Sequence, residues 1–280
     1  MKIGIVGQGY VGTAVKTVFE KHYDINTFDL NGNCSCDSLD DLVIHSDIIF
    51  VCVPTPMKKD GSCDTSIVEG VVKDINGISY WADGERIVAI KSTVPPGTTN
   101  NLNKKSENIT VIFNPEFLTE ANFIDDFKNQ NRIIIGGQRP ATTRLRQIYS
   151  LAFPDATIVK TGSKTAEMVK YFTNTFLATK VSFANEMYQI CSRLGIDYDK
   201  VVEYSTYDER LGKSHWAVPG PDGHFGFGGS CFPKDINALI QLGLELDMTP
   251  EVLIAAWHTN LDVRPEEDWK ELRGRAVVDE

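Results

Sequence analysis

The segment of residues 226–235 contains the side chain with the most distinctive chemistry, that of Cys231. Three glycines precede this cysteine and allow a close approach of the backbone to a substrate. Pro233 suits the first turn of a helix, so we expect Cys231 just before the positive end of that helix. The helix dipole and the neighbouring Lys234 both favour a thiolate, the nucleophilic form of the side chain. A buried cysteine in a glycine-rich turn is the alternative at this point.

Two carboxylates follow a predicted strand in Asn114-Pro115-Glu116-Phe117-Leu118-Thr119-Glu120. Glu116 and Glu120 are four residues apart, and one of them could act as a general acid or base. Carboxylates are also common on solvated turns, so both interpretations remain open.

A third polar group lies on one face of a long predicted helix and consists of Glu167, Lys170 and Asn174. Lys170 and Asn174 are separated by four residues and therefore point the same way. This face is either solvated or, if the helix is a central spine, directed into a cleft.

Residues 7–12 are Gly7-Gln8-Gly9-Tyr10-Val11-Gly12, between a predicted strand and a predicted helix. The first glycine permits a tight turn, the second lets a pyrophosphate approach the backbone, and the third packs helix on strand. Asp29 follows 17 residues after Gly12, where a carboxylate would bind a ribose 2′-hydroxyl and repel a 2′-phosphate. The pattern predicts dinucleotide binding and favours NAD over NADP. A tight turn without a ligand is the alternative.

Two further segments follow predicted strands, Val53-Pro54-Thr55-Pro56 and Lys91-Ser92-Thr93-Val94-Pro95-Pro96-Gly97. Open α/β sheets bind ligands at the carboxyl ends of their strands. We therefore expect the hydroxyl groups of these segments to face the same crevice, with ordinary proline-rich strand exits as the alternative.

These motifs need a sheet to position them, and the first half of the sequence predicts one. Apolar runs rich in Ile and Val alternate with amphipathic stretches, which is typical of parallel strands covered on both faces. The predicted strands are residues 2–6, 24–28, 47–53, 86–91, 110–113 and 132–135. The fold class is therefore α/β, with a doubly wound Rossmann domain at the N-terminus.

The second half of the sequence predicts an α-helical domain. One helical pattern runs from Ser163 to Leu194, and shorter ones cover residues 233–246 and 250–263. The apolar face of the long helix consists of Met168, Phe172, Phe176, Phe183, Met187, Ile190 and Leu194. We expect a Rossmann domain over residues 1–160 and a helical domain with a long central helix over residues 161–280.

Composition excludes several classes of protein. The 280 residues are 42% hydrophobic and 24% charged, with a formal net charge of −10. These values exclude a disordered chain and disfavour a general nucleic-acid binder, which needs positive charge. No apolar run is long enough to span a membrane. The six cysteines have no zinc-ligand spacing, so we expect no metal site and a reducing, cytoplasmic environment.

Taken together and in this order, the motifs resemble those of the UDP-glucose 6-dehydrogenase family of nucleotide-sugar dehydrogenases. The resemblance covers about residues 1–265, and residues 226–235 are its most specific part. It implies an NAD-dependent enzyme that oxidises the C6 alcohol of a nucleotide-sugar to a carboxylate, UDP-glucose being the expected substrate. Two hydride transfers would proceed through a cysteine thiohemiacetal and a thioester.

The resemblance also implies a role for each motif residue. Catalytic roles are implied for Cys231 as nucleophile, Glu116 as acid or base, Lys170 and Asn174 as oxyanion donors, and Thr93 and Asp235 as residues that order water. Cofactor contacts are expected at Gly7, Gln8, Gly9, Tyr10, Val11, Gly12, Asp29, Val53, Pro54, Thr55, Pro56, Ser92, Thr93 and Glu120. Substrate contacts are expected at Glu116, Phe117, Leu118, Lys170, Asn174, Arg210, Phe227, Gly228 and Lys234, with Arg210 reaching the substrate of a neighbouring subunit.

One departure from the family concerns the C-terminal part. Members normally continue into a second Rossmann-like domain that helps to bind the nucleotide, whereas this chain stops at Glu280. We expect a short form without that UDP-binding domain, natural or truncated, which forms a homodimer through the long helix. Two other functions stay open: a two-electron β-hydroxyacid-type dehydrogenase, which has no use for Cys231, and a non-catalytic NAD-binding remnant.

Overall fold

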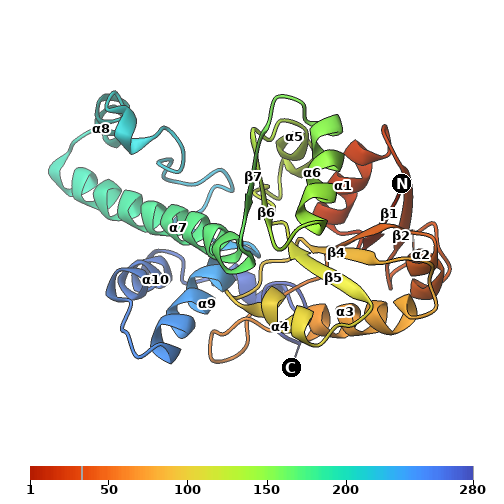
Figure 1. The fold of residues 1–280 in the computed structure, drawn as a ribbon. Coiled ribbons are helices and arrows are strands. Elements are labelled where there is room, and N and C mark those ends of the chain that lie inside the picture. Colours follow the sequence, from red (N-terminus) through yellow and green to blue (C-terminus); the bar gives the residue numbers. More distant parts are fainter. Residues whose placement is uncertain (33, 280) are drawn as a thin grey trace. The chain divides into compact units, whose positions relative to one another are not determined.

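The structure is a computed structural model that describes residues 1–32 and 34–279 (Figure 1). The chain forms two compact units. Unit 1 consists of Met1–Thr55 and Thr65–Lys170, and unit 2 consists of Pro56–Asp64 and Tyr171–Glu280. The segment Pro56–Asp64 thus belongs to unit 2, although the residues on both sides of it in the sequence belong to unit 1.

Unit 1 is built around a seven-stranded sheet with the strand order β2-β1-β3-β4-β5-β6-β7. The strands are β1 (Lys2–Val6), β2 (Asp24–Phe28), β3 (Ile48–Val51), β4 (Arg86–Ile90), β5 (Ile109–Phe113), β6 (Arg132–Gly136) and β7 (Thr157–Thr161). Neighbouring strands from β2 to β5 are parallel. Because β1 lies between β2 and β3, the carboxyl ends of β1 and β3 form the switch point at which such sheets bind ligands.

Helices cover both faces of this sheet. They are α1 (Tyr10–Phe19), α2 (Leu39–Ile44), α3 (Ser66–Ser79), α4 (Thr98–Lys104), α5 (Phe123–Lys128) and α6 (Ala141–Ala152). α1, α5 and α6 share one apolar core with strand residues such as Ile5 and Phe50. α2, α3 and α4 share the other with strand residues such as Ile49 and Val88. Successive side chains of a strand point to opposite faces, so the apolar strand runs fill both cores and the predicted doubly wound fold is confirmed.

The far end of the sheet differs from the prediction. β6 runs antiparallel to β5 and shares one register pair with it, Phe113 with Gly136. Residues Ile133 to Gly136 are buried, so the apolar run correctly indicated burial on both faces but carried no information on direction. β7 was not predicted, because its side chains are exposed or half-buried and only two of them are apolar.

Unit 2 is helical, as the second half of the sequence predicts. Its elements are α7 (Ser163–Leu194), which begins in unit 1, α8 (Tyr198–Ser205), η1 (Glu209–Leu211), α9 (Phe232–Glu245), α10 (Glu251–Val263) and η2 (Asp268–Glu271). α7 has the predicted bounds, and its 32 residues span about 48 Å at 1.5 Å per residue. α7, α9 and α10 share an apolar core that includes Ala178, Ile236 and Ala256. α8 was not predicted.

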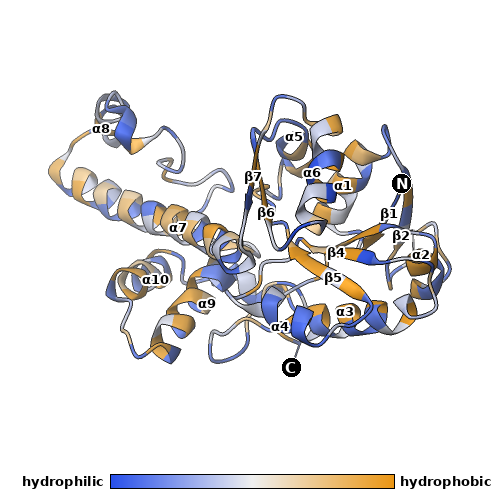
Figure 2. Cartoon of the chain, viewed as in Figure 1, coloured by the Kyte–Doolittle hydropathy of each residue, from blue (hydrophilic) through white to orange (hydrophobic). Residues whose placement is uncertain are grey.

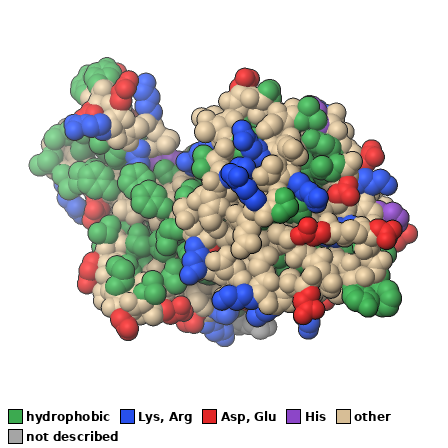
Figure 3. Space-filling view, in the orientation of Figure 1, with side chains coloured by type: hydrophobic (Ala, Val, Ile, Leu, Met, Phe, Trp, Pro, Cys, Tyr) green, Lys and Arg blue, Asp and Glu red, His purple; other side chains and the backbone are tan. Residues whose placement is uncertain are grey.

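On α7 the polar side is buried and the apolar side is exposed, which is the reverse of an ordinary surface helix. Glu167, Lys170, Asn174 and Asn185 are at most 6% exposed. Large apolar side chains are exposed instead, namely Phe172, Phe176, Phe183, Ile190 and Leu194. The hydropathy colours of Figure 2 and the green side chains over α7 in Figure 3 show this apolar side. The interpretation of the polar side as a solvated face is therefore wrong.

In the part of the chain that the structure describes, no helix combines the length and the apolar character needed to cross a membrane.

Candidate active site

The turn between β1 and α1 has the backbone that the glycine motif predicts. Gly7 has a φ angle of 92°, and a Cβ atom there would lie 2.5 Å from the carbonyl oxygen of Cys52. A Cβ atom on Gly12 would overlap the carbonyl oxygen of Gly7, whereas the space beside Gly9 is open. α1 begins at Tyr10, which places the positive end of its dipole at the switch point. The turn can therefore accept a diphosphate against its backbone.

Asp29 follows β2 and is held by two backbone amides. Its Oδ2 accepts a hydrogen bond from the Gln8 amide at 2.6 Å, and its Oδ1 accepts one from the Asn31 amide at 2.8 Å. Each carboxylate oxygen can accept a second hydrogen bond, so the ribose hydroxyls of a dinucleotide still find acceptors here. The tight turn, the open space and the fixed carboxylate fit NAD.

The polar residues after β3 and β4 are mostly engaged within unit 1. The Ser92 hydroxyl donates to the Val53 carbonyl oxygen at 2.6 Å and so joins the two strand ends. Thr55 and Thr93 are buried. Pro54 is the exposed residue of this exit, and Pro56 begins the segment that belongs to unit 2.

Glu116, one of the two carboxylates of the motif after β5, has a side chain that is 10% exposed. Its Oε1 lies 3.0 Å from the Lys170 Nζ, and its Oε2 accepts the Leu118 amide at 2.5 Å. Lys170 also donates to the Glu116 carbonyl oxygen at 2.7 Å. Burial alone would raise the pKa of Glu116, but the Lys170 charge and these hydrogen bonds overcome it and hold the pKa below its ordinary value. Glu116 is therefore an ionised carboxylate in a site almost closed to water.

The residues after Glu116 differ in their surroundings. The ring centroid of Phe117 lies near two cations of unit 1, at 4.2 Å from the Arg132 guanidinium carbon and 5.4 Å from the Lys170 Nζ. Leu118 contributes its amide to Glu116. Glu120 is half-buried. The two carboxylates of this motif are thus not equivalent, since Glu116 is the one paired with Lys170.

Glu167, at the start of the polar side of α7, holds a loop of unit 1. Its carboxylate accepts the Gly97 amide at 2.6 Å and the Thr99 amide at 2.8 Å. It therefore stabilises the start of α4, where unpaired amides favour a negative charge. This contact gives the first turn of the polar side a structural role.

Cys231 occupies the N-cap position of α9 in unit 2, as predicted from Pro233. The side chain of its neighbour Lys234 is 12% exposed and donates to Asp235 Oδ1 at 2.5 Å. Burial opposes a charge on Lys234, but Asp235, and then Cys231 and Cys63, raise the pKa of Lys234 above its ordinary value. A cation that stays protonated next to a helix N-terminus favours the thiolate form of Cys231.

Asn174 joins α7 to this part of unit 2. Its Nδ2 donates to Asp235 Oδ2 at 2.6 Å, and Asp235 is 1% exposed. Asp235 therefore accepts from Asn174 on one oxygen and from Lys234 on the other. Asn174 lies one helical turn after Lys170 on α7.

At two of the three glycines before Cys231, neighbouring side chains of the protein leave no room for a Cβ atom, which the sequence did not reveal. A Cβ atom on Gly228 would overlap the guanidinium of Arg264 and the carboxylate of Asp268, and one on Gly226 would overlap the Asn260 amide. Arg264 is buried and lies 2.7 Å from Asp268. Of the three glycines, Gly229 alone has open space beside it. The approach of a substrate to these glycines stays a prediction, which the open space beside Gly229 supports.

The remaining predicted substrate residues of unit 2 differ in exposure. Phe227 is buried in the core of α7, α9 and α10. The Arg210 side chain is 89% exposed and pairs with Asp208 at 2.5 Å. The reach of Arg210 to a neighbouring subunit stays a prediction.

Sequence reasoning missed a polar cluster in unit 1 formed by Lys91, Asn114 and Tyr149, all at most 2% exposed. The Lys91 Nζ donates to Asn114 Oδ1 at 3.1 Å and to the Tyr149 hydroxyl at 3.3 Å. The sequence offered one indication of this cluster, which is that Lys91 directly follows an apolar strand covered on both faces.

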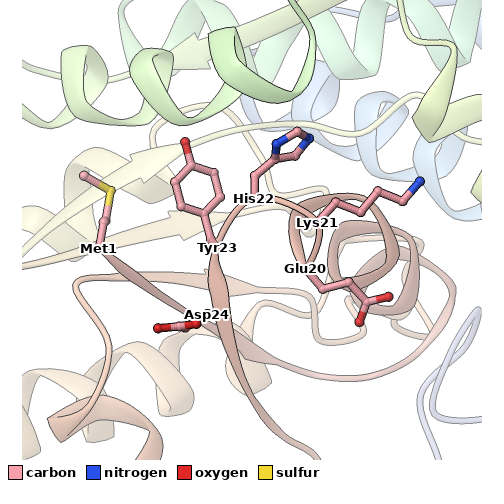
Figure 4. A pocket seen from close by; sticks show the side chains of 6 residues that line it. All are labelled: Met1, Glu20, Lys21, His22, Tyr23 and Asp24. Carbon is pink, nitrogen blue, oxygen red and sulfur yellow. The ribbon is translucent and has the colours of Figure 1, made fainter.

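A pocket at the other edge of the sheet carries none of the predicted site residues. It is lined by Met1, Glu20, Lys21, His22, Tyr23 and Asp24, at the beginnings of β1 and β2 (Figure 4). Ligands of open α/β sheets bind at the opposite, carboxyl ends of strands. No group of metal-binding side chains occurs among the described residues.

Two family models match the chain. Residues 30–152 match the NAD binding domain of the UDP-glucose/GDP-mannose dehydrogenase family, and residues 164–262 match the central domain of the same family. The chain is 30% identical to the UDP-glucose 6-dehydrogenase of Haloferax volcanii, with 100% of this chain and 74% of that protein covered. It is 36% identical to a UDP-glucose 6-dehydrogenase of Bacillus subtilis over 77% of this chain and 46% of that protein. The chain thus spans about half the length of several of the curated relatives it matches.

Solved structures that are similar to this chain include dehydrogenases that act on nucleotide-sugars. A UDP-glucose dehydrogenase from Pyrobaculum islandicum is 30% identical with a TM-score of 0.86, covering 97% of this chain and 70% of that one. A GDP-mannose dehydrogenase from Pseudomonas aeruginosa is 28% identical with a TM-score of 0.69, covering 97% and 71%. A 3-hydroxyisobutyrate dehydrogenase from Mycobacterium tuberculosis is 15% identical with a TM-score of 0.75, covering 95% and 94%, which is a likeness of fold.

Proposed function

The chain belongs to the UDP-glucose/GDP-mannose dehydrogenase family of NAD-dependent enzymes, and from this premise we propose that it oxidises the C6 alcohol of UDP-glucose to the carboxylate. The observation that carries the proposal is Cys231 at the N-terminus of α9, near Lys234, a half-buried lysine that Asp235 keeps protonated. A single oxidation of an alcohol needs no nucleophile, whereas two successive oxidations must retain the aldehyde between them.

The proposed role of Cys231 is to retain that aldehyde. The thiolate sulfur forms a bond to the aldehyde carbon, and the carbonyl π electrons move to the oxygen and give the oxyanion of a thiohemiacetal. Bound NAD supplies the hydride acceptor for each of the two oxidations. Loss of the second hydride leaves a thioester on Cys231, and water then displaces the thiolate to give the acid.

The other predicted residues have distinct proposed roles. Lys170 and Asn174 donate hydrogen bonds to the oxygen of the tetrahedral carbon, where such donors contribute most. Glu116 accepts the proton of the alcohol and later of water, for which its ionised state is suitable. Thr93 and Asp235 order the water. In the structure Lys170 and Asn174 each donate to a carboxylate of their own unit, so both amine and amide protons are already oriented by fixed acceptors.

A homodimer is part of the same proposal. Two copies would associate through the exposed apolar side of α7. The stacked rings of Phe172 and Phe176, whose centroids are 6.5 Å apart, lie on this side. Exposed Arg210 would then contact the substrate of the neighbouring subunit. Light scattering should show a dimer, and Phe172→Asp should convert it to a monomer.

The decisive experiment measures the NADH formed per nucleotide-sugar consumed, with UDP-glucose and GDP-mannose as substrates. Two NADH per UDP-glucose and a uronate product are expected. One NADH per substrate would favour a two-electron dehydrogenase of the β-hydroxyacid type. Binding of NAD without turnover of either sugar would favour a non-catalytic remnant.

A further inference from the structure

Lys91 is a cation buried in the core of unit 1. It directly follows β4, is 2% exposed, and its Nζ lies 5.6 Å and 5.9 Å from the ring centroids of Phe127 and Tyr149. Both of its hydrogen-bond acceptors, on Asn114 and Tyr149, are neutral. A buried ammonium group is costly in free energy unless its surroundings compensate it, and a methionine would fill the same space. The lysine therefore calls for a functional reason.

The cluster joins four elements of unit 1 at one point. Tyr149 of α6 donates to Asn114 Oδ1 at 2.5 Å, which leaves its hydroxyl oxygen to accept from Lys91. Asn114 Nδ2 donates to the Ile134 carbonyl oxygen of β6 at 2.8 Å. β5 and β6 share a single register pair, so this side-chain bond extends a short junction. Asn114 is thereby fixed on β4, β6 and α6, two residues before Glu116.

Lys91 also acts on Glu116 through its charge. Burial raises the pKa of Glu116, Lys170 lowers it, and Lys91 lowers it further. In the reverse direction, burial lowers the pKa of Lys91 to about 8, Cys52 and Glu116 oppose this shift, and Lys170 reinforces it. Glu116 is thus influenced by two cations, Lys170 in direct contact and Lys91, which hydrogen-bonds to Asn114 two residues earlier in the chain.

We propose that Lys91, Asn114 and Tyr149 are positioning residues for Glu116, in which Asn114 fixes the start of the turn and Lys91 supplies a second positive charge to the carboxylate. This inference rests on the proposed function, in which Glu116 is the acid or base. A merely structural cluster would affect the melting temperature and leave the titration of Glu116 unchanged.

Three variants separate charge from hydrogen bonding. Lys91→Gln keeps a donor for Asn114 and loses the charge, Lys91→Met loses both, and Tyr149→Phe loses one hydroxyl and keeps the charge. The titration of Glu116 is followed by the ¹³C signal of its carboxyl group, assigned by its loss in Glu116→Gln. Both Lys91 variants should raise the titration midpoint of Glu116, because a positive charge near the carboxylate is lost, and Tyr149→Phe should leave it near the wild-type value. If Lys91→Met does not fold, Lys91→Gln alone decides.

The pH profile of kcat provides the second measurement. The fall of kcat at low pH should move to higher pH by the same amount in both Lys91 variants, while Tyr149→Phe should lower kcat without moving it. An unchanged titration midpoint in Lys91→Gln would overturn the inference. Because the carbon signal needs no turnover, an enzyme that produces no NADH from either sugar would overturn the proposed function and still leave the charge effect of Lys91 measurable.

Discussion

Each unit of the molecule places a lysine near a cysteine, and the pKa values of the two lysines are shifted in opposite directions. In unit 1, burial raises the pKa of Cys52 to about 12 against the opposing charge of Lys91, and burial lowers the pKa of Lys91 to about 8. In unit 2, Asp235 lies 2.5 Å from Lys234 and raises the pKa of Lys234 despite burial. The difference is a carboxylate in direct contact, because Lys234 donates to Asp235 whereas both hydrogen-bond acceptors of Lys91 are neutral. A lysine favours a thiolate when an acid keeps it charged, and a thiol in an apolar core stays protonated even with a lysine in range.

The largest expected effect is on the rate of acid formation, and it should differ between variants of the two cysteines. Cys231→Ser should lower the rate of acid formation by roughly a thousandfold or more, as expected for loss of a nucleophile, because a hydroxyl is a far weaker nucleophile than a thiolate. Cys52→Ser should stay within a few fold of wild type. NADH formation and uronate formation from UDP-glucose are measured for both variants. Comparable losses in the two variants would remove the distinction between the pairs.

A third lysine, Lys170, has a carboxylate partner and should be essential for that reason. Lys170→Met should lower kcat by roughly a hundredfold, the effect of losing one oxyanion donor. It should also lower the free energy of unfolding by about 3 kcal/mol, because Glu116 stays buried without its partner. The double variant Lys170→Met/Glu116→Gln should regain stability and not activity. An unchanged kcat with a lower melting temperature would assign Lys170 a structural role only.

The sequence predicted those features that depend on neighbours along the chain. The bounds of α7, the turn at Gly7 and the position of Cys231 before α9 follow from local periodicity and from the conformational limits of glycine and proline. The doubly wound fold could be predicted from the apolar strand runs, because the side chains of these runs fill the cores on both faces of the sheet. These are the parts of the fold in which local preference and tertiary packing agree.

The features that escaped prediction depend on contacts between residues far apart in the sequence. Gly228 is required by Arg264, which is 36 positions away. Tyr149 hydrogen-bonds to Asn114 from 35 positions away, and the direction of β6 is set by its partner strand. The polar side of α7 could not be assigned from periodicity alone, because a helix with a buried polar side and an exposed apolar side has the same period as an ordinary surface helix.

The rate of alkylation by iodoacetamide tests whether each lysine stabilises the thiolate form of Cys231. Only the thiolate reacts, so Lys234→Gln, which keeps a hydrogen-bond donor for Asp235, should slow the alkylation of Cys231 roughly tenfold. Lys91→Gln should leave that rate unchanged, and Cys52 should react slowly in every variant. Mass spectrometry of the two cysteine peptides measures both rates in one sample. Equal rates for Cys231 in wild type and Lys234→Gln would mean that Lys234 does not stabilise the thiolate.

The remaining expected effect is on stability, which should change with pH in opposite directions for Lys91 and Lys234. The pKa of Lys91 is lowered to about 8 in the folded protein from 10.5 in the unfolded chain, so between these values the unfolded state binds more protons and stability rises with pH. Relative to Lys91→Met, the free energy of unfolding of the wild type should rise by at most about 3 kcal/mol between pH 8 and 10.5, at about 1.4 kcal/mol per pKa unit. The pKa of Lys234 is raised above 10.5, so its contribution should be complete below that pH and lost above it. Urea unfolding at a series of pH values measures both differences. A wild-type advantage over Lys91→Met that does not change across this range would mean that Lys91 stays charged in the core, and the contrast between the two pairs would then lie in the cysteines alone.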